Sequence, residues 1–296
     1  MIFLVDISGY IHASAHKMKG AKLKNEDGLQ TGIVYGVLRS LSNLCDTFQP
    51  SAMALCYDAG RTLRDVVYPE YKANRKRDPE IQEQITNQTE MLLDFAALLP
   101  YVQVREQGIE ADDVIAHISY SLAALCKIRC TIVTKDKDLH QLQRKRCNIV
   151  GLDGRKPDPE FTPAQIVAYK VLVGDSSDNV KGVLGLGDKT ARKLLIEFES
   201  LKEIMSQARR GNIKLGKMSY EEAKPIVDRN MDLMRLDGRL LTQQQADNIL
   251  QSFNDQLQQP FQIDRDALRE KLQEYQFKSF LMRFTSFCDT FGCLER

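Results

Sequence analysis

The sequence predicts an α/β fold with a mostly parallel sheet flanked by helices, followed by a helical C-terminal region. In the first half, short β-type runs alternate with longer helical patterns. Strands joined by helices form βαβ units, which give parallel, buried sheets. After Pro157-Asp158-Pro159 the character changes, and residues 163–296 carry helical patterns almost throughout. We therefore expect two parts, 1–170 and 171–296, fused rather than flexibly linked, with a soft boundary near 160–172.

The individual elements follow from apolar periodicity. Strands are expected at residues 2–5, 52–57, 102–104, 131–134 and 148–150. Helices are expected at residues 30–48, 85–99 and 112–125. The first of these helices shows the pattern most clearly, because Ile33, Val37, Leu41, Leu44 and Phe48 recur at spacings of four, four, three and four residues. Strands and helices therefore alternate along the first half of the chain.

Composition limits the class of protein. The chain has 296 residues, of which 43% are hydrophobic and 27% charged, and this excludes a disordered chain, a collagen-like repeat and a small disulfide scaffold. The seven cysteines form no C-x-x-C pair, so we expect reduced thiols rather than a zinc site. The N-terminus is apolar for only five residues before Asp6, and no window approaches about 18 consecutive apolar residues. Neither a signal peptide nor a membrane span is expected, and we predict a cytoplasmic protein.

Acidic residues lie where the predicted strands end. Asp6 and Asp58 directly follow apolar strands, and Asp136 follows one after a single residue. Because ligands bind outside the carboxyl ends of parallel strands, these three side chains are expected to converge on one place. Further acids come in clusters that extend the set. The nine candidate metal ligands are Asp6, Asp58, Glu110, Asp112, Asp113, Asp136, Asp138, Asp175 and Asp178.

Nine carboxylates at one edge of a sheet would repel each other if they were unpaired. Hard oxygen ligands without His or Cys indicate Mg²⁺ or Mn²⁺ rather than zinc. Nine exceed what one ion uses, and two ions about 3.5–4 Å apart suit a site that cleaves phosphodiesters. Taken alone, Asp112 and Asp113 are better explained as helix caps, and a pair of turn residues is an alternative for Asp136 and Asp138. The joint arrangement of several clusters after apolar strands favours the metal site.

A basic segment and a glycine-rich segment add contacts for a polyanion. Residues 71–77 carry four basic residues and no acid. A solvated surface is the ordinary explanation, but an aromatic beside a lysine near a metal site also suits phosphate neutralisation and base stacking. Residues 182–191 indicate a hairpin that enters a helix whose free N–H groups bind phosphate, with an ordinary turn between packed helices as the alternative. Residues 181–217 hold nine basic against four acidic residues, which suits contact with a duplex backbone.

Together these motifs resemble the structure-specific 5′-nuclease family, most closely the 5′-nuclease domain of bacterial DNA polymerase I and its free-standing and phage relatives. The resemblance runs from Leu4 to about Phe287. The segments that carry it are Gly32-Ile33-Val34-Tyr35-Gly36, Tyr57-Asp58, Tyr71-Lys72-Ala73-Asn74-Arg75, Glu110-Ala111-Asp112-Asp113, Thr134-Lys135-Asp136-Lys137-Asp138-Leu139, Gly174-Asp175-Ser176-Ser177-Asp178-Asn179 and Gly185-Leu186-Gly187-Asp188-Lys189-Thr190-Ala191.

The resemblance implies a PIN-like sheet, a helical arch at about residues 70–95 and a helix-three-turn-helix element for duplex DNA at about residues 174–198. It implies that Asp6, Asp58, Glu110, Asp112 and Asp113 surround one Mg²⁺, and that Asp136, Asp138, Asp175 and Asp178 surround a second, with Mn²⁺ as an alternative ion. Lys72 and Arg75 match a basic pair that contacts the scissile phosphate. The implied DNA contacts are Tyr71, Arg77, Gly185, Gly187, Lys189, Thr190, Arg192 and Lys193. The hairpin at residues 182–187 matches an element whose backbone carbonyls hold K⁺.

One departure from the family pattern follows Asp6. The family usually has Gly and then an aromatic–Arg pair, whereas this chain has Ile7 and His12-Ala13. His12, Lys17 and Lys19 are the nearby candidates to hold the strand at the 5′ end. No metal position is missing, which argues against a degenerate relative that only binds DNA.

The residues and the resemblance together predict a divalent-metal-dependent 5′-3′ exonuclease and flap endonuclease of DNA replication and repair. It is expected to hydrolyse DNA phosphodiesters near 5′ single-strand/duplex junctions by two-metal-ion catalysis, as a bacterial or phage-encoded monomer without a membrane partner. RNA–DNA substrates are left open, and the alternatives are a PIN-type ribonuclease and a non-catalytic junction-binding module. The formal net charge of +1 agrees with a DNA partner, because setting aside the nine ligands leaves 41 basic against 31 acidic residues.

Overall fold

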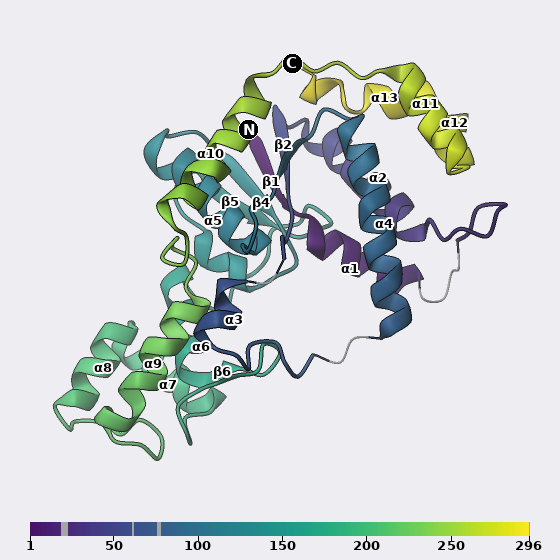
Figure 1. Cartoon of the computed structure of the whole chain (residues 1–296). Coiled ribbons are helices and arrows are strands. Elements are labelled where there is room, and N and C mark those ends of the chain that lie inside the picture. The colour runs from purple at the N-terminus through teal and green to yellow at the C-terminus, as the bar shows by residue number, and fades with distance from the viewer. Residues whose placement is uncertain (19–22, 61, 76–77, 296) are drawn as a thin grey trace.

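The computed structural model describes every residue except 19–22, 61, 76–77 and 296 (Figure 1). Its centre is a five-stranded parallel sheet with the strand order β3-β2-β1-β4-β5. The strands are β1 (Ile2–Asp6), β2 (Ala52–Cys56), β3 (Val102–Val104), β4 (Cys130–Val133) and β5 (Cys147–Val150). Each of the five predicted strands is confirmed to within one or two residues. The central strands β1, β2 and β4 are mostly apolar runs buried on both faces, whereas the edge strands β3 and β5 carry the polar residues Gln103 and Asn148.

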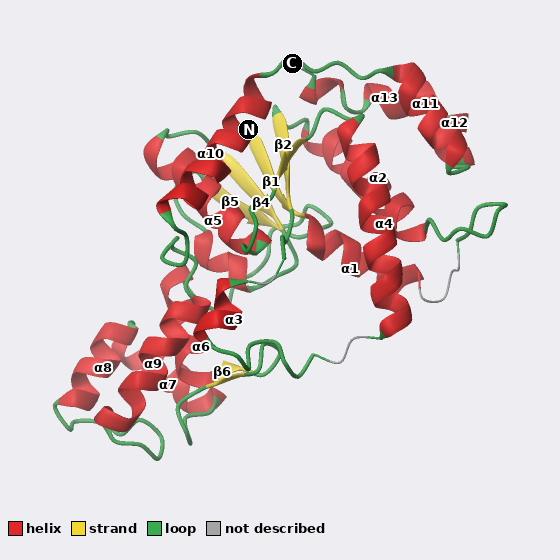
Figure 2. Cartoon of the chain, viewed as in Figure 1, coloured by secondary structure: helices red, strands yellow, loops and turns green. Residues whose placement is uncertain are grey.

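Alternate residues of each strand face two different cores, because successive side chains in a strand point to opposite faces of the sheet. In β1, Phe3 and Val5 pack against α1 (Ile7–Met18), α2 (Gly32–Phe48) and α4 (Pro79–Ala97). Ile2 and Leu4 pack against α5 (Ala111–Tyr120) and α10 (Gln243–Gln258) on the other face. Figure 2 shows the sheet enclosed between these two groups of helices.

Helix boundaries differ from the predicted ones for local reasons. The helix expected at 85–99 is α4 and begins at Pro79, because Asp78 accepts a hydrogen bond from the Glu80 N–H and the first turn is polar. The helix expected at 112–125 is α5, followed by a π-helical turn at Ser121–Leu125. Helix α1 was not predicted, because it follows β1 without an intervening turn signal.

Helices α6 (Pro163–Val173), α7 (Asp188–Phe198), α8 (Leu201–Arg209) and α9 (Tyr220–Met234) pack around a separate apolar core at the lower left of Figure 1. A two-stranded antiparallel ribbon of β6 (Gly174–Asp175) and β7 (Val180–Lys181) connects α6 to the glycine-rich segment before α7. This ribbon was not predicted, and it holds the two aspartates of the 174–179 motif against the sheet edge. The glycine-rich hairpin enters a helix as expected.

The chain returns to the sheet after α9. Helix α10 packs on the face that carries α5, and α11 (Arg265–Glu274), α12 (Lys278–Met282) and α13 (Phe284–Asp289) pack on the face that carries α1, α2 and α4. A further short helix, α3 (Leu63–Val67), lies beside α9. Contacts therefore cross the predicted boundary at residue 170, and the division into 1–170 and 171–296 stays a prediction. No helix in the described part of the chain is long and apolar enough to span a membrane.

Candidate active site

The carboxyl edge of the sheet collects acidic side chains from several elements. β1 ends on Asp6, Asp58 lies two residues beyond β2, and Asp136 lies three residues beyond β4. The start of α5 adds Glu110 and Asp112 at the same edge. The convergence follows from the parallel strand order, because all carboxyl ends of parallel strands point the same way.

Asp6 is fixed in the floor of the site. It is 5% exposed, and its oxygens accept hydrogen bonds from the Gly9 N–H at 3.0 Å and the Thr134 hydroxyl at 2.8 Å. Burial, with smaller contributions from the neighbouring carboxylates of Asp58 and Asp136, raises the pKa of Asp6 to about 6 despite these two bonds. The site therefore concentrates negative charge in a place with little water.

Asp58 binds the N-terminal ends of two helices, α1 and α5. Its carboxylate accepts from the Ala111 N–H and from the Ser8 hydroxyl, each at 2.8 Å. Burial raises the pKa of Asp112 strongly, and the charges of Asp6 and Asp136 add to the shift. Carboxylates that raise one another's pKa lack a counter-charge. Their hard oxygens match the ligand preference of Mg²⁺ or Mn²⁺, so the donor set fits the predicted metal chemistry.

A lysine holds the second group of acids. Lys170 of α6 is ion-paired with Asp138 and donates to Asp175 at 2.6 Å. Burial raises the pKa of Asp138 to about 6 even though Lys170 opposes the shift. Burial also acts to raise the pKa of Asp175, but hydrogen bonds from Lys170 and Ser177 outweigh it and lower this pKa to about 2. Lys170 was not predicted from the sequence, where its only signal is its position on a helix five residues before Asp175.

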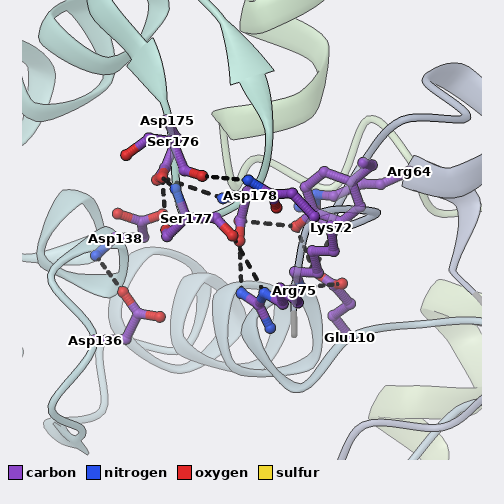
Figure 3. A network of polar contacts seen from close by, with 12 residues as sticks. Arg64, Lys72, Arg75, Glu110, Asp136, Asp138, Asp175, Ser176, Ser177 and Asp178 are labelled. Carbon is purple, nitrogen blue, oxygen red and sulfur yellow. Dashed lines mark hydrogen bonds and ion pairs between the residues drawn. The ribbon is translucent and has the colours of Figure 1, made fainter. Parts of the chain in front are cut away.

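The predicted basic pair reaches the acids directly (Figure 3). Lys72 Nζ lies 2.6 Å from Glu110 Oε1, and Arg75 Nη2 lies 2.5 Å from Asp178 Oδ1. The Lys72 N–H also donates to the carbonyl of Asp178 at 2.8 Å. Lys72 has a left-handed φ of 56°, a strained conformation for a residue with a side chain. The segment that carries the pair is thereby attached to both groups of acids.

Tyr71 is positioned differently from a base-stacking residue. It is 7% exposed and packs with Tyr68, Val180 and Leu233. Its hydroxyl lies 3.3 Å from carboxylate oxygens of Glu110 and of Asp178. In this structure the ring lies in an apolar cluster and the hydroxyl contacts the acids, and a role in base stacking stays a prediction.

A buried arginine holds Asp113. Arg64 of α3 is 3% exposed and makes a two-pronged ion pair with Asp113, with one Nη2–Oδ1 distance of 3.0 Å. It also donates to Glu110 at 3.1 Å and to the carbonyl of Leu233 at 2.8 Å. Asp113 therefore faces Arg64, while Asp112 lines the acid pocket. Arg64 was not predicted from the sequence, because the residues around it do not distinguish a buried arginine from one on the surface.

Four cations thus occupy the positions between the acids. Lys72, Arg75, Lys170 and Arg64 each bind one or two of the nine predicted ligands. Within the described ranges, no three acidic, histidine or cysteine side chains converge closely enough to hold one ion. The assignment of nine metal ligands therefore stays a prediction, which requires ions to displace some of these ammonium and guanidinium groups.

Six of the predicted DNA contacts, at residues 185–193, lie at the start of α7. Gly187 caps α7 with open space around it, and Lys189, Thr190 and Lys193 are exposed on the first turns of α7. Gly185 has a φ of +78°, which favours glycine.

Other predicted contacts are occupied or not described. Arg192 is bound to Asp188 and Glu160 and lies over the rings of Phe161 and Tyr169. His12 is exposed on α1. Arg77 and Lys19 lie outside the described residues, as does the side chain of Lys17.

Comparison with known proteins agrees with this architecture. Residues 1–170 match the family model described as "5'-3' exonuclease, N-terminal resolvase-like domain", and residues 161–251 match "5'-3' exonuclease, C-terminal SAM fold". The 5'-3' exonuclease of Bacillus subtilis is 31% identical over 223 residues, covering 69% of this chain and 74% of that protein. DNA polymerase I of Treponema pallidum is 33% identical over 255 residues, covering 78% of this chain but only 25% of the polymerase.

Solved structures show the same fold. The T5 D15 protein co-crystallised with metal ions superposes with a TM-score of 0.69 at 18% identity, covering 86% of this chain and 98% of that one. The T5 D15 flap endonuclease in a complex with DNA and metal ions gives the same TM-score and covers 87% and 99%. The predicted fold class and the predicted kind of enzyme, a nuclease, are confirmed. The chain belongs to the 5′-3′ exonuclease family.

Proposed function

We propose that this nuclease hydrolyses DNA phosphodiesters near 5′ single-strand/duplex junctions, as a 5′-3′ exonuclease and a flap endonuclease that uses two Mg²⁺ ions. The observation that carries the proposal is the contact of Lys72 with Glu110 and of Arg75 with Asp178 at the acid-rich edge of the sheet. A phosphate and divalent cations together match this arrangement, because the cations pair with the acids and the phosphate pairs with the two basic side chains.

Two groups of residues would hold the ions. We assign Asp6, Asp58, Glu110 and Asp112 to the first ion, and Asp136, Asp138, Asp175 and Asp178 to the second; the shared acid pocket and the mutual effects of these carboxylates on their pKa values support this division. When bound, the divalent ions supply Lewis-acid stabilisation of the phosphate and activation of water. Mn²⁺ offers the same octahedral oxygen chemistry. Asp113 contributes by fixing Arg64, which in turn holds Glu110.

Lys72 and Arg75 orient the scissile phosphate. With Glu110 committed to a divalent ion, Lys72 Nζ would be free to donate to a non-bridging phosphate oxygen, where negative charge grows during cleavage. Arg75 offers a planar fork that binds a second phosphate oxygen or the next phosphate. The exposed N-terminus of α7 with Lys189 and Lys193 would hold the duplex backbone, and the carbonyls of the hairpin at 182–187 would hold K⁺.

Flap cleavage tests the proposal. A 5′-flap DNA labelled at its 5′ end is expected to be cut by a monomeric enzyme in Mg²⁺ or Mn²⁺ and not in EDTA. Asp58→Asn and Asp136→Asn are expected to lose cleavage while binding the flap in Ca²⁺ nearly as tightly as the unchanged protein. Asp255→Asn, at an exposed acid of α10, serves as the matched control and should cut normally. Undiminished cleavage by both site variants would overturn the metal assignment.

A matched RNA flap separates the ribonuclease alternative. Faster cleavage of the RNA flap than of the DNA flap would favour a PIN-type ribonuclease. Tight junction binding without cleavage under any metal would favour a non-catalytic module.

A further inference from the structure

A cavity of about 880 Å³ lies between α5 and the helices α6, α8 and α9. Residues 235–238, which follow α9, close one side of it. Leu236 borders both this cavity and the acid pocket, but none of the nine predicted metal ligands lines it. The volume lies in the range of pockets that enclose small organic ligands. The proposed nuclease mechanism does not use this cavity.

Most of the cavity wall is apolar. Leu142, Val167, Met205, Val227 and Met231 are among the side chains that line it. Methionines adapt their shape to a bound apolar group at little cost. A polynucleotide matches this wall poorly, because its backbone requires cations and its bases require flat aromatic faces. The wall fits the hydrocarbon or aromatic body of a small molecule.

The acids at the rim are already neutralised. Asp228 is ion-paired with Lys224, and Asp237 is paired with Arg235 at 3.0 Å and with Arg239 at 2.9 Å. These pairs leave no acidic charge at the rim without a counter-charge.

Two basic side chains at the rim have no acidic partner among the residues that the structure describes. Arg144 donates through Nε to a backbone carbonyl and lies 5.6 Å from the centre of the Tyr120 ring, which leaves its outer nitrogens without a carboxylate. Lys202, exposed in the first turn of α8, likewise makes no ion pair within the described ranges. The lining also includes His117, whose buried Nε2 has no hydrogen-bond partner in the described part of the chain. Arg144 and Lys202 therefore give the rim a surplus of positive charge.

We propose that this cavity binds an organic anion that has an apolar body and a single carboxylate, sulfonate or phosphate head group. The head group is held by Arg144 and Lys202, and the body lies against Val167, Met205 and Met231. Charged hydrogen bonds give the head group its affinity, and burial of apolar surface gives the remainder.

Anilinonaphthalene sulfonate is a suitable first probe because it combines an aromatic body with one sulfonate. Its fluorescence should rise on binding, and calorimetry should give one molecule per chain. Decanoate is expected to displace it at least about tenfold more effectively than decanol, which has the same chain but no charge. Absence of saturable binding of both the sulfonate probe and decanoate would overturn the proposal. Equal displacement by decanoate and decanol would also overturn it.

Two variants locate the bound probe. Arg144→Gln/Lys202→Gln is expected to weaken binding by about tenfold or more. The control Lys145→Gln/Arg210→Gln removes the same charge from exposed residues outside the cavity lining and should change binding less than about twofold. Ala164→Phe places a ring in the cavity and should abolish binding. Thermal melting shows whether each variant is folded, and equal binding by the two charge variants would contradict the site.

Discussion

Replacing Arg64 with methionine is expected to destabilise the protein far more than the loss of a surface ion pair would. Arg64 is 3% exposed and binds Asp113, Glu110 and the carbonyl of Leu233. Its removal leaves the buried carboxylate of Asp113 without its counter-charge and leaves Glu110 with Lys72 as its cationic partner. Burial acts against the charged guanidinium, but the Asp113 charge and hydrogen bond outweigh burial and raise the pKa of Arg64, so the guanidinium stays charged.

The expected loss follows from the geometry. Breaking a buried ion pair by removing one partner costs about 3–5 kcal/mol. For a chain of this length each kcal/mol corresponds to about 2 °C in Tm, so Tm should fall by about 6–10 °C. Asp113→Asn combined with Arg64→Met removes both charges of the two-pronged pair. The double variant should therefore be less destabilised than the sum of the single variants by about 1–3 kcal/mol.

Urea unfolding in EDTA, followed by far-UV circular dichroism, measures these free energies without a contribution from metals. The matched control is Arg265→Met, because Arg265 pairs with Asp289 at 2.7 Å on the surface, where both side chains are about half exposed. That variant should lose less than about 1 kcal/mol. Arg64→Met and Arg265→Met would lower the free energy of unfolding equally if the Arg64–Asp113 ion pair were no stronger than a surface pair. That result, or strictly additive losses in the Arg64/Asp113 double-mutant cycle, would contradict a stabilising buried ion pair.

Three further predictions address the site and the helical unit. Lys72→Ala should slow single-turnover cleavage by about 10²–10³-fold while changing flap binding in Ca²⁺ by less than about tenfold, and the reverse pattern would remove its role at the phosphate. The pKa of Asp175 is about 2, below the ordinary 3.8, because Lys170 and Ser177 stabilise its charged form. This interaction adds about 2 kcal/mol to the free energy of unfolding of the metal-free protein above pH 4, and the contribution is lost as the pH falls towards 2. Lys170→Met should therefore lower the urea unfolding midpoint at pH 7, and the difference from the wild-type midpoint should shrink as the pH falls below 4. A difference that stays constant with pH would contradict the ion pair. Gly182→Ala should lower the free energy of unfolding in urea by about 1–3 kcal/mol, because its Cβ would lie 2.2 Å from the backbone of Val173 in α6. Gly187→Ala, whose Cβ would have no atom within 4 Å, should lower it by less than about 1 kcal/mol. Equal losses would contradict the close approach at Gly182.

Strand positions and the acidic edge were predictable because both depend on local sequence. An apolar run buried on both faces marks a parallel strand, and an acid directly after such a run must lie at the carboxyl edge. Asp6 and Asp58 therefore lie at the edge where the sequence argument expected them. The same reasoning did not reveal α1, which continues from β1 without a cap or turn residue.

The cations of the site were not predictable in the same way. Arg64 and Lys170 are brought to the acids by contacts between α3, α5, α6 and α9, and no local pattern distinguishes them from solvated basic residues. Asp113 was grouped with the metal ligands because it adjoins Asp112, but successive residues of a helix point about 100° apart. That angle separates Asp113, on Arg64, from Asp112, in the acid pocket. Tyr71 was expected at a base, yet the fold places its ring in an apolar cluster.

Anomalous diffraction from Mn²⁺-soaked crystals would show whether the acids at the carboxyl edge of the sheet bind two divalent ions. We expect two peaks, one within about 2.0–2.6 Å of oxygens of Asp6, Asp58, Glu110 or Asp112, and one within the same range of Asp136, Asp138, Asp175 or Asp178. Asp113 is expected to stay on Arg64. The absence of any peak at this edge at saturating Mn²⁺ would contradict two-ion binding, and the side chains of Lys72, Arg75, Lys170 and Arg64 would then be the counter-charges that the described residues supply.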